Sequence, residues 1–220
     1  MILTPIDAGA LPALLSSFAA SLGDADARLV FARIAGSGEA ARAKGRHAAA
    51  HHREAVALAL AQGMEIIPAS PASGVSWDGR AVRAHTEAYV LIHEVAHFQL
   101  ASPERRRRID FGLGPGPETG DRSAADRDAV LFGLAREREE ASASLLGILW
   151  EAALRQPALA SFLDQNWLEG AGRPGAARHF TSVLHHLRAG GFLDAAFRPV
   201  CRLRQEPDPL PYDKVFRGAA

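Results

Sequence analysis

The distribution of apolar side chains predicts a mainly helical chain. Between residues 11 and 22, leucine and phenylalanine recur every three or four positions, the spacing of an amphipathic helix that Gly23 would end. Residues 84–100 are apolar along most of their length and contain no Gly or Pro, which is typical of a buried helix. The same periodicity predicts further helices over residues 126–154 and 176–189.

Short apolar runs in the middle of the chain indicate strands. One run is centred on Ile66 and a second on Trp77, and Pro and Gly residues separate them. Residues 113–122 contain too many Gly and Pro residues for regular structure, so we expect a loop that shapes access to a neighbouring site. These patterns predict an α+β fold, mainly helical, with a small β-sheet beside the helix of residues 84–100.

The predicted buried helix contains an H-E-x-x-H motif, formed by His93, Glu94 and His97. Helical positions four apart share a face, so the two imidazoles can bind one metal ion while Glu94 lies beside it. Burying these polar groups among apolar side chains is costly unless a metal satisfies them. The alternative is two histidines that share this spacing by chance. A metal-binding helix of this type beside a small sheet is the arrangement of a zincin-like core.

A third ligand is expected from the polar segment at residues 136–144. We favour Glu140 over Glu137 and Glu139, because small side chains on its helix face leave room for a metal and a substrate. These small residues are Ala143, Ser144 and Gly147. The alternative is a surface cluster of paired Glu and Arg charges.

Two other polar groups leave alternatives open. His47 and His51 have the spacing of a second metal site, although their segment is hydrophilic and fits a solvated helix. The four consecutive arginines at residues 105–108 indicate either a solvated face or a patch that binds an acidic partner.

With the motif at the centre, we divide the chain into a helical N-terminal extension (1–63), a metal-binding catalytic domain (64–206) and a tail (207–220).

The composition favours a soluble, cytoplasmic protein. The 220 residues include 25 Lys and Arg and 25 Asp and Glu, so no overall charge favours direct binding of nucleic acid or a membrane. The single cysteine, Cys201, cannot form an internal disulfide, which fits a reducing compartment. We find no signal peptide and no apolar run long enough to cross a membrane. The oligomeric state is not predicted.

The order of segments resembles the elongation factor P hydroxylase family, bacterial enzymes that finish the modification of a lysine on a translation factor. The resemblance covers about two-thirds of the chain, roughly from residue 65 to 205. It rests on His85 eight residues before HEVAH, on the IDFG sequence at Ile109–Gly112, on the glutamate helix REREEASASLLGILW and on NWLEG at residues 166–170.

The resemblance implies an Fe(II)- and O₂-dependent monooxygenase that hydroxylates a modified lysine of elongation factor P. Its metal ligands would be His93, His97 and Glu140, and the catalytic Glu94 would handle protons. The same ligands also suit a zinc-dependent metallopeptidase, in which Glu94 takes the proton of a zinc-activated water. A third hypothesis is a non-catalytic protein in which the metal is structural or which binds a translation factor without reacting.

Overall fold

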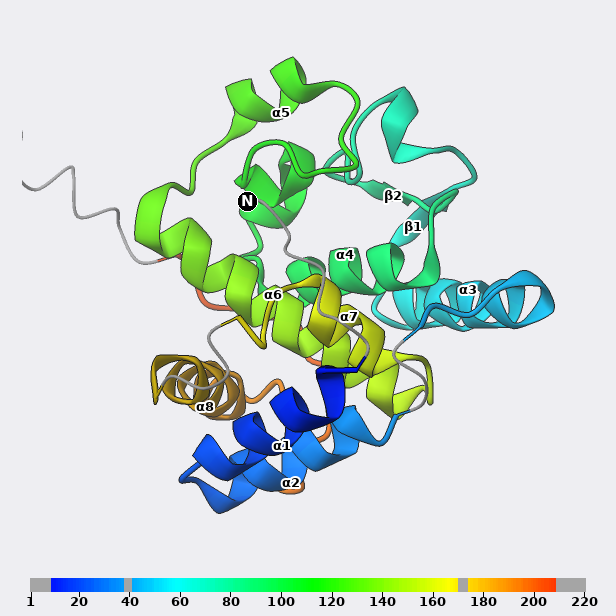
Figure 1. The fold of residues 1–220 in the computed structure, drawn as a ribbon. Helices are drawn as coiled ribbons and strands as arrows, with labels where there is room; N and C mark the ends of the chain where they lie inside the picture. Colours follow the sequence, from blue (N-terminus) through cyan, green and yellow to red (C-terminus); the bar gives the residue numbers. More distant parts are fainter. Residues whose placement is uncertain (1–8, 38–40, 170–173, 209–220) are drawn as a thin grey trace, which may run out of the picture.

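The computed structural model describes residues 9–37, 41–169 and 174–208, and within them the chain is mainly helical (Figure 1). The two strands are β1 (Glu65–Ile67) and β2 (Ala81–Arg83). The helices are α1 (Leu11–Ser21), α2 (Ala25–Ala35), α3 (Gly45–Ala61), α4 (Ala88–Leu100), α5 (Arg122–Asp128), α6 (Gly133–Ala153), α7 (Ala158–Asp164) and α8 (Pro174–Ala189).

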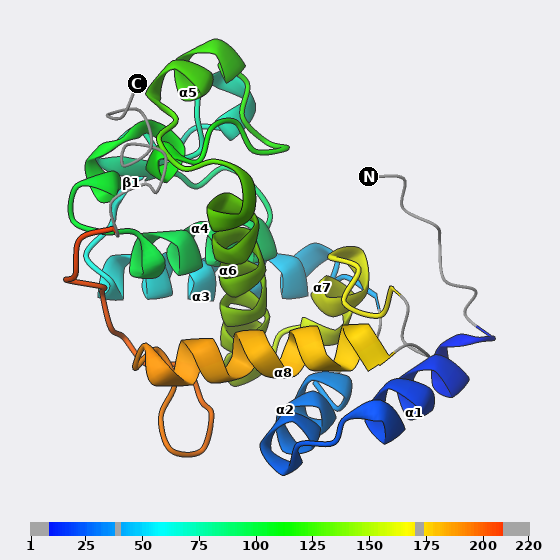
Figure 2. The same ribbon diagram turned by 90° about the vertical axis from the view of Figure 1, so that its left-hand side faces the viewer.

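Helix α6 is the central helix, and α2, α4, α7 and α8 pack against it (Figures 1 and 2). Its packing against α4, the helix that carries the H-E-x-x-H motif, is the most extensive between any two described elements. Gly147 lies in this contact, and a Cβ atom there would be 3.5 Å from the Cα atom of His93. A side chain larger than a methyl group would therefore push α6 away from α4, and with it Glu140 away from the two histidines.

An aromatic cluster joins the N-terminal helices to α7 and α8. Phe18, Phe31, Phe162 and Phe180 come from four different helices, and their ring centroids are 4.8 to 6.5 Å apart. These rings belong to the same buried cluster as the apolar face of α4, so the core runs without interruption from α1 to the motif helix. The division of the chain at residues 63/64 and 206/207 stays a prediction, and residues 209–220 of the tail lie outside the described residues.

The small sheet consists of two parallel strands. Ile66 of β1 pairs with Val82 of β2, and Trp77 forms an isolated antiparallel bridge to Val82. Parallel strands need a long connection, and here residues 68–80 supply it with a 3₁₀ turn and a loop. The predicted α+β class with a helical majority and a small sheet is confirmed.

The helix expected over residues 126–154 is interrupted. The chain leaves helical geometry at Ala129, and the amides of Val130 and Leu131 both donate to the carbonyl of Gly112, at 2.8 and 3.1 Å. Helix α6 then begins at Gly133, which has a φ of 53°, a left-handed value that suits glycine. The apolar pattern did not show this break because the hydrogen bonds that stabilise it come from a distant segment.

A buried carboxylate, Glu151, links α6 to α7. Its exposed fraction is 2%, and its Oε1 atom accepts a hydrogen bond from the Ser161 hydroxyl. An Nη1 atom of Arg42 lies 3.4 Å from the other carboxylate oxygen. Burial raises the pKa of Glu151 to about 7, because the contacts with Ser161 and Arg42 offset only part of the loss of water.

We expect Glu151→Gln to flatten the dependence of stability on pH. The pKa of Glu151 is higher in the folded chain than its ordinary 4.5, so its contribution is complete below pH 4.5 and is lost as the pH rises through about 7. A shift of this size corresponds to about 3 kcal/mol. Urea unfolding of the two proteins between pH 5 and 8 measures it. Glu65→Gln, which alters an exposed carboxylate that is not among the groups that shift the pKa of Glu151, is the control, and an unchanged profile in Glu151→Gln would contradict the assignment.

Candidate metal centre

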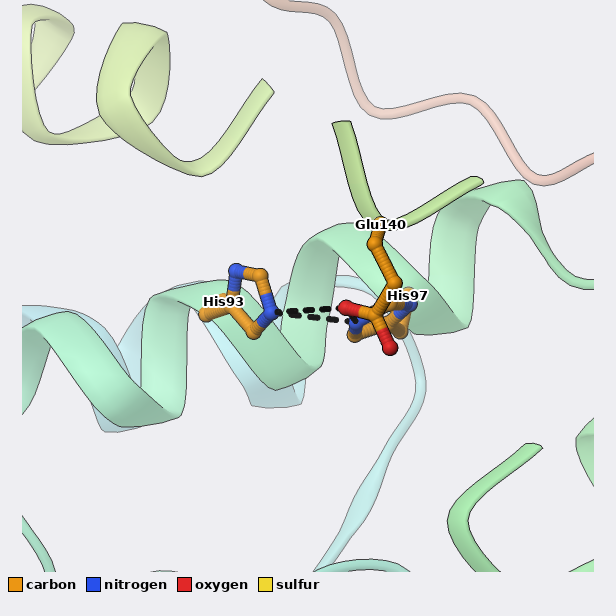
Figure 3. Close-up of side chains that lie close together, drawn as sticks. All are labelled: His93, His97 and Glu140. Carbon is orange, nitrogen blue, oxygen red and sulfur yellow. Dashed lines mark hydrogen bonds and ion pairs between the residues drawn. The ribbon is translucent and has the colours of Figure 1, made fainter. Parts of the chain in front are cut away.

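His93 and His97 lie one turn apart on the face of α4 that meets α6. Their Nε2 atoms are 3.0 Å apart (Figure 3). His97 is buried, with 4% of its surface exposed, whereas the His93 side chain is partly open to solvent. The spacing of four residues thus produces the shared face that a helix dictates.

The side chain of Glu140 extends from α6 toward the two imidazoles (Figure 3). Its Oε2 atom lies 3.4 Å from His97 Nε2 and 3.8 Å from His93 Nε2. Its other oxygen is 3.7 Å from the guanidinium of Arg136, one turn earlier on α6. The structure therefore brings together the three residues predicted as metal ligands, and among the described residues this is the one group with the spacing of a metal site.

The three donor atoms fit a divalent metal ion. Donors at about 2.1 Å from one ion lie about 3.0 Å apart at right angles and about 3.4 Å apart in a tetrahedral arrangement. The three separations between these Nε2 and Oε2 atoms, 3.0, 3.4 and 3.8 Å, are close to these values. Two imidazoles and one carboxylate suit either Fe(II) or Zn²⁺, so the group could hold a metal without defining which one.

The charges at this site favour a cation. Burial alone would lower the pKa of His97, but the carboxylates of Glu139 and Glu140 outweigh it and raise the pKa to about 10. Burial lowers the pKa of His93, and the two histidines hold the pKa of Glu140 well below its usual range although burial opposes this. The two carboxylates therefore favour a positive charge at His97, and a bound metal ion would supply one.

Glu94 lies beside the three donors and lines the cavity in front of them. Burial raises the pKa of its carboxyl to about 8, and nearby Asp110 and Glu140 add to this effect while His97 opposes it. A cation bound next to this carboxyl would lower its pKa again. The group is thus placed to hold or release a proton inside the cavity.

The cavity in front of the donors has a volume of about 690 Å³, enough for a long side chain or a small ligand. The predicted loop contributes Gly116, Pro117 and Glu118 to its wall. Trp167 of the NWLEG segment also lines the cavity and stacks on His179 of α8, with ring centroids 5.4 Å apart. The Trp167 indole donates to the Ser144 hydroxyl at 2.7 Å, which attaches this wall to α6.

His85 lies outside this cavity. It lines a second cavity of about 760 Å³ together with His51 and His52. The two cavities share Tyr89 and Glu118 as lining residues. His47 and His51 form no metal-type cluster within the described part of the chain.

The interpretation of residues 105–108 as a solvated or partner-binding face is wrong for Arg105. Its exposed fraction is 3%, and its guanidinium pairs with Glu139 and Asp208. Arg106 donates to the carbonyl groups of Ala101 and Arg204. Arg105 and Arg106 therefore serve internal contacts with distant segments, whereas Arg107 is exposed.

Glu139 is the residue near the histidines that sequence reasoning set aside. Its Oε1 atom lies 3.9 Å from Nδ1 of His97, so adjacent glutamates face the two nitrogens of one imidazole. The only signal for it in the sequence was its position next to Glu140.

No protein-family model, curated protein or solved structure matches the chain.

Proposed function

We propose that the chain is a divergent member of the elongation factor P hydroxylase family, with a zincin-like core and an Fe(II)- and O₂-dependent reaction on a modified lysine. The observation that carries the proposal is the group of His93, His97 and Glu140, of which His93 and Glu140 line a cavity. The resemblance of the IDFG and NWLEG segments supports the choice of family. A translation factor as substrate would place the reaction in the cytoplasm.

Each residue has a defined task in this reaction. His93, His97 and Glu140 would hold Fe(II), which supplies the activation of O₂. The cavity between the Gly116–Glu118 wall and Trp167 would hold the lysine side chain away from bulk water. Glu94 would exchange protons within it. One oxygen atom enters a C–H bond as a hydroxyl, and the other leaves as water with two protons and two electrons from an external reductant.

An intact-mass measurement tests the proposal. Elongation factor P with its modified lysine is incubated with the Fe(II)-loaded protein, ascorbate and air, and a gain of about 16 mass units is expected from the added oxygen atom. Samples without air, and samples with His97→Ala in place of the wild type, are the controls. Absence of a mass gain with the iron-loaded wild type would contradict this function.

A zinc-dependent metallopeptidase is the alternative that the same site supports. The specific observation in its favour is Glu94, a buried carboxyl that adjoins a ligand and faces the cavity, where it could take the proton of an attacking water. Metal analysis of protein purified without air separates the two hypotheses. Iron favours the hydroxylase, and zinc together with cleavage of an unstructured protein favours the peptidase.

A further inference from the structure

The far side of the His97 ring faces a carboxylate. The Nε2 atom of His97 points toward His93 and Glu140, and its Nδ1 atom lies 3.9 Å from Oε1 of Glu139. This Nδ1 atom is buried and has no hydrogen-bond partner among the described residues. The Glu139 side chain is itself only 10% exposed. A buried ring nitrogen therefore has an anionic acceptor just beyond hydrogen-bond distance.

Arg105 holds the Glu139 carboxylate in place through two contacts. Its Nη1 atom donates to Glu139 Oε1 at 2.8 Å, and its Nη2 atom donates to the other oxygen of the same group. This two-point contact sets both the position and the plane of the carboxylate, which a single charge could not do. The Nε atom of Arg105 also donates to Asp208 at 2.7 Å.

Arg105 also bonds to the backbone of Phe111, whose ring contacts His97. Its Nη1 atom donates to the carbonyl of Phe111 at 3.1 Å. The Phe111 ring stacks on the His97 imidazole, with centroids 5.8 Å apart and planes inclined by 23°. Phe111 has a φ of 55°, an unfavourable backbone for a bulky residue that surrounding contacts must maintain. Arg105 thus contacts both Glu139 and Phe111, the two residues that border the His97 ring here.

We propose that Glu139 and Arg105 are positioning residues of the metal centre: Arg105 fixes Glu139, and Glu139 accepts the Nδ1–H of His97 so that Nε2 keeps its lone pair for the metal. Metal-binding histidines usually donate their second nitrogen to such an acceptor, which sets the tautomer and the ring orientation. A movement of about 1 Å would bring the two atoms to the length of a charge-assisted hydrogen bond. The inference rests on the proposed metal site.

Titration with Co(II) alone tests the assignment, because d–d absorption reports binding without any need for turnover. We expect Glu139→Gln to weaken Co(II) binding about 10- to 100-fold relative to the wild type. Asp208→Asn is the matched control, because it removes the other carboxylate from Arg105 without facing His97, and we expect its affinity to stay within about twofold. If Glu139→Gln does not fold, Glu139→Asp replaces it, since it keeps a charge for Arg105 but withdraws from His97.

A second readout separates positioning from mere stabilisation. In the Co(II)-loaded wild type, the shifted proton resonance of His97 Nδ1–H should exchange slowly with water, and in the Glu139 variant it should exchange faster. Equal Co(II) affinity and equal exchange in both proteins, even with a lower unfolding temperature in the variant, would overturn the positioning role. Failure of the wild type to bind Co(II) would instead overturn the proposed metal site.

Discussion

Replacing His97 with alanine is expected to abolish stoichiometric metal binding. The variant removes one of three protein donors and leaves Glu140 near only one imidazole. Structural zinc sites with a full ligand set are worth about 10–16 kcal/mol, so the loss of one donor should weaken binding by about a hundredfold or more. The measurement is metal content after gel filtration, together with Co(II) titration. His93→Ala should behave in the same way.

The glutamates of α6 provide an internal ranking for the same experiment. Glu140→Ala should weaken metal binding as strongly as loss of a histidine, because its oxygen lies 3.4 and 3.8 Å from the two Nε2 atoms. Glu137→Ala changes an exposed residue of the same helix and should leave the affinity unchanged. Retained stoichiometric metal in both histidine variants would refute the site, whatever the glutamates do.

The part of the centre that could be predicted from sequence is the part with local causes. Two histidines four positions apart share a face on any α-helix, so their contact needs no knowledge of the fold. The choice of Glu140 used a second local rule, that small side chains on its helix face leave room for a metal and a substrate. Ser144 does line the cavity, whereas Gly147 lies where α6 packs against His93.

The parts that could not be predicted depend on contacts between distant segments. From its neighbours in the sequence, Arg105 is expected to be a surface charge. The fold instead places it against Glu139 on α6 and against Asp208. The break before Gly133 depends on the Gly112 carbonyl, which the apolar pattern cannot reveal. The reaction class was likewise left open, because two imidazoles and a carboxylate suit both iron and zinc.

The described part of the chain contains no helix that is long and apolar enough to cross a membrane. A single exposed cysteine, Cys201, also gives that part of the chain no internal disulfide.

Glu94→Gln is expected to stop turnover while the protein keeps its metal. The carboxyl lines the cavity but is not one of the three clustered donors, so its amide analogue should bind metal with unchanged stoichiometry. Proton transfer by a positioned group contributes about 10²- to 10⁴-fold to a rate, and the amide cannot perform it. Initial rates with saturating substrate, by mass gain or by peptide cleavage, measure the effect.

Glu87→Gln is the matched control, because the same substitution then alters an exposed carboxylate at the start of α4 that is not among the residues lining this cavity. The product shows which reaction Glu94 serves. A hydroxyl added to the substrate lysine in the wild type and lost in Glu94→Gln supports the hydroxylase, whereas peptide cleavage lost in the same variant supports the peptidase. Full activity of Glu94→Gln with either substrate would show that this carboxyl transfers no proton in that reaction, and a cavity group other than Glu94 would then have to do so.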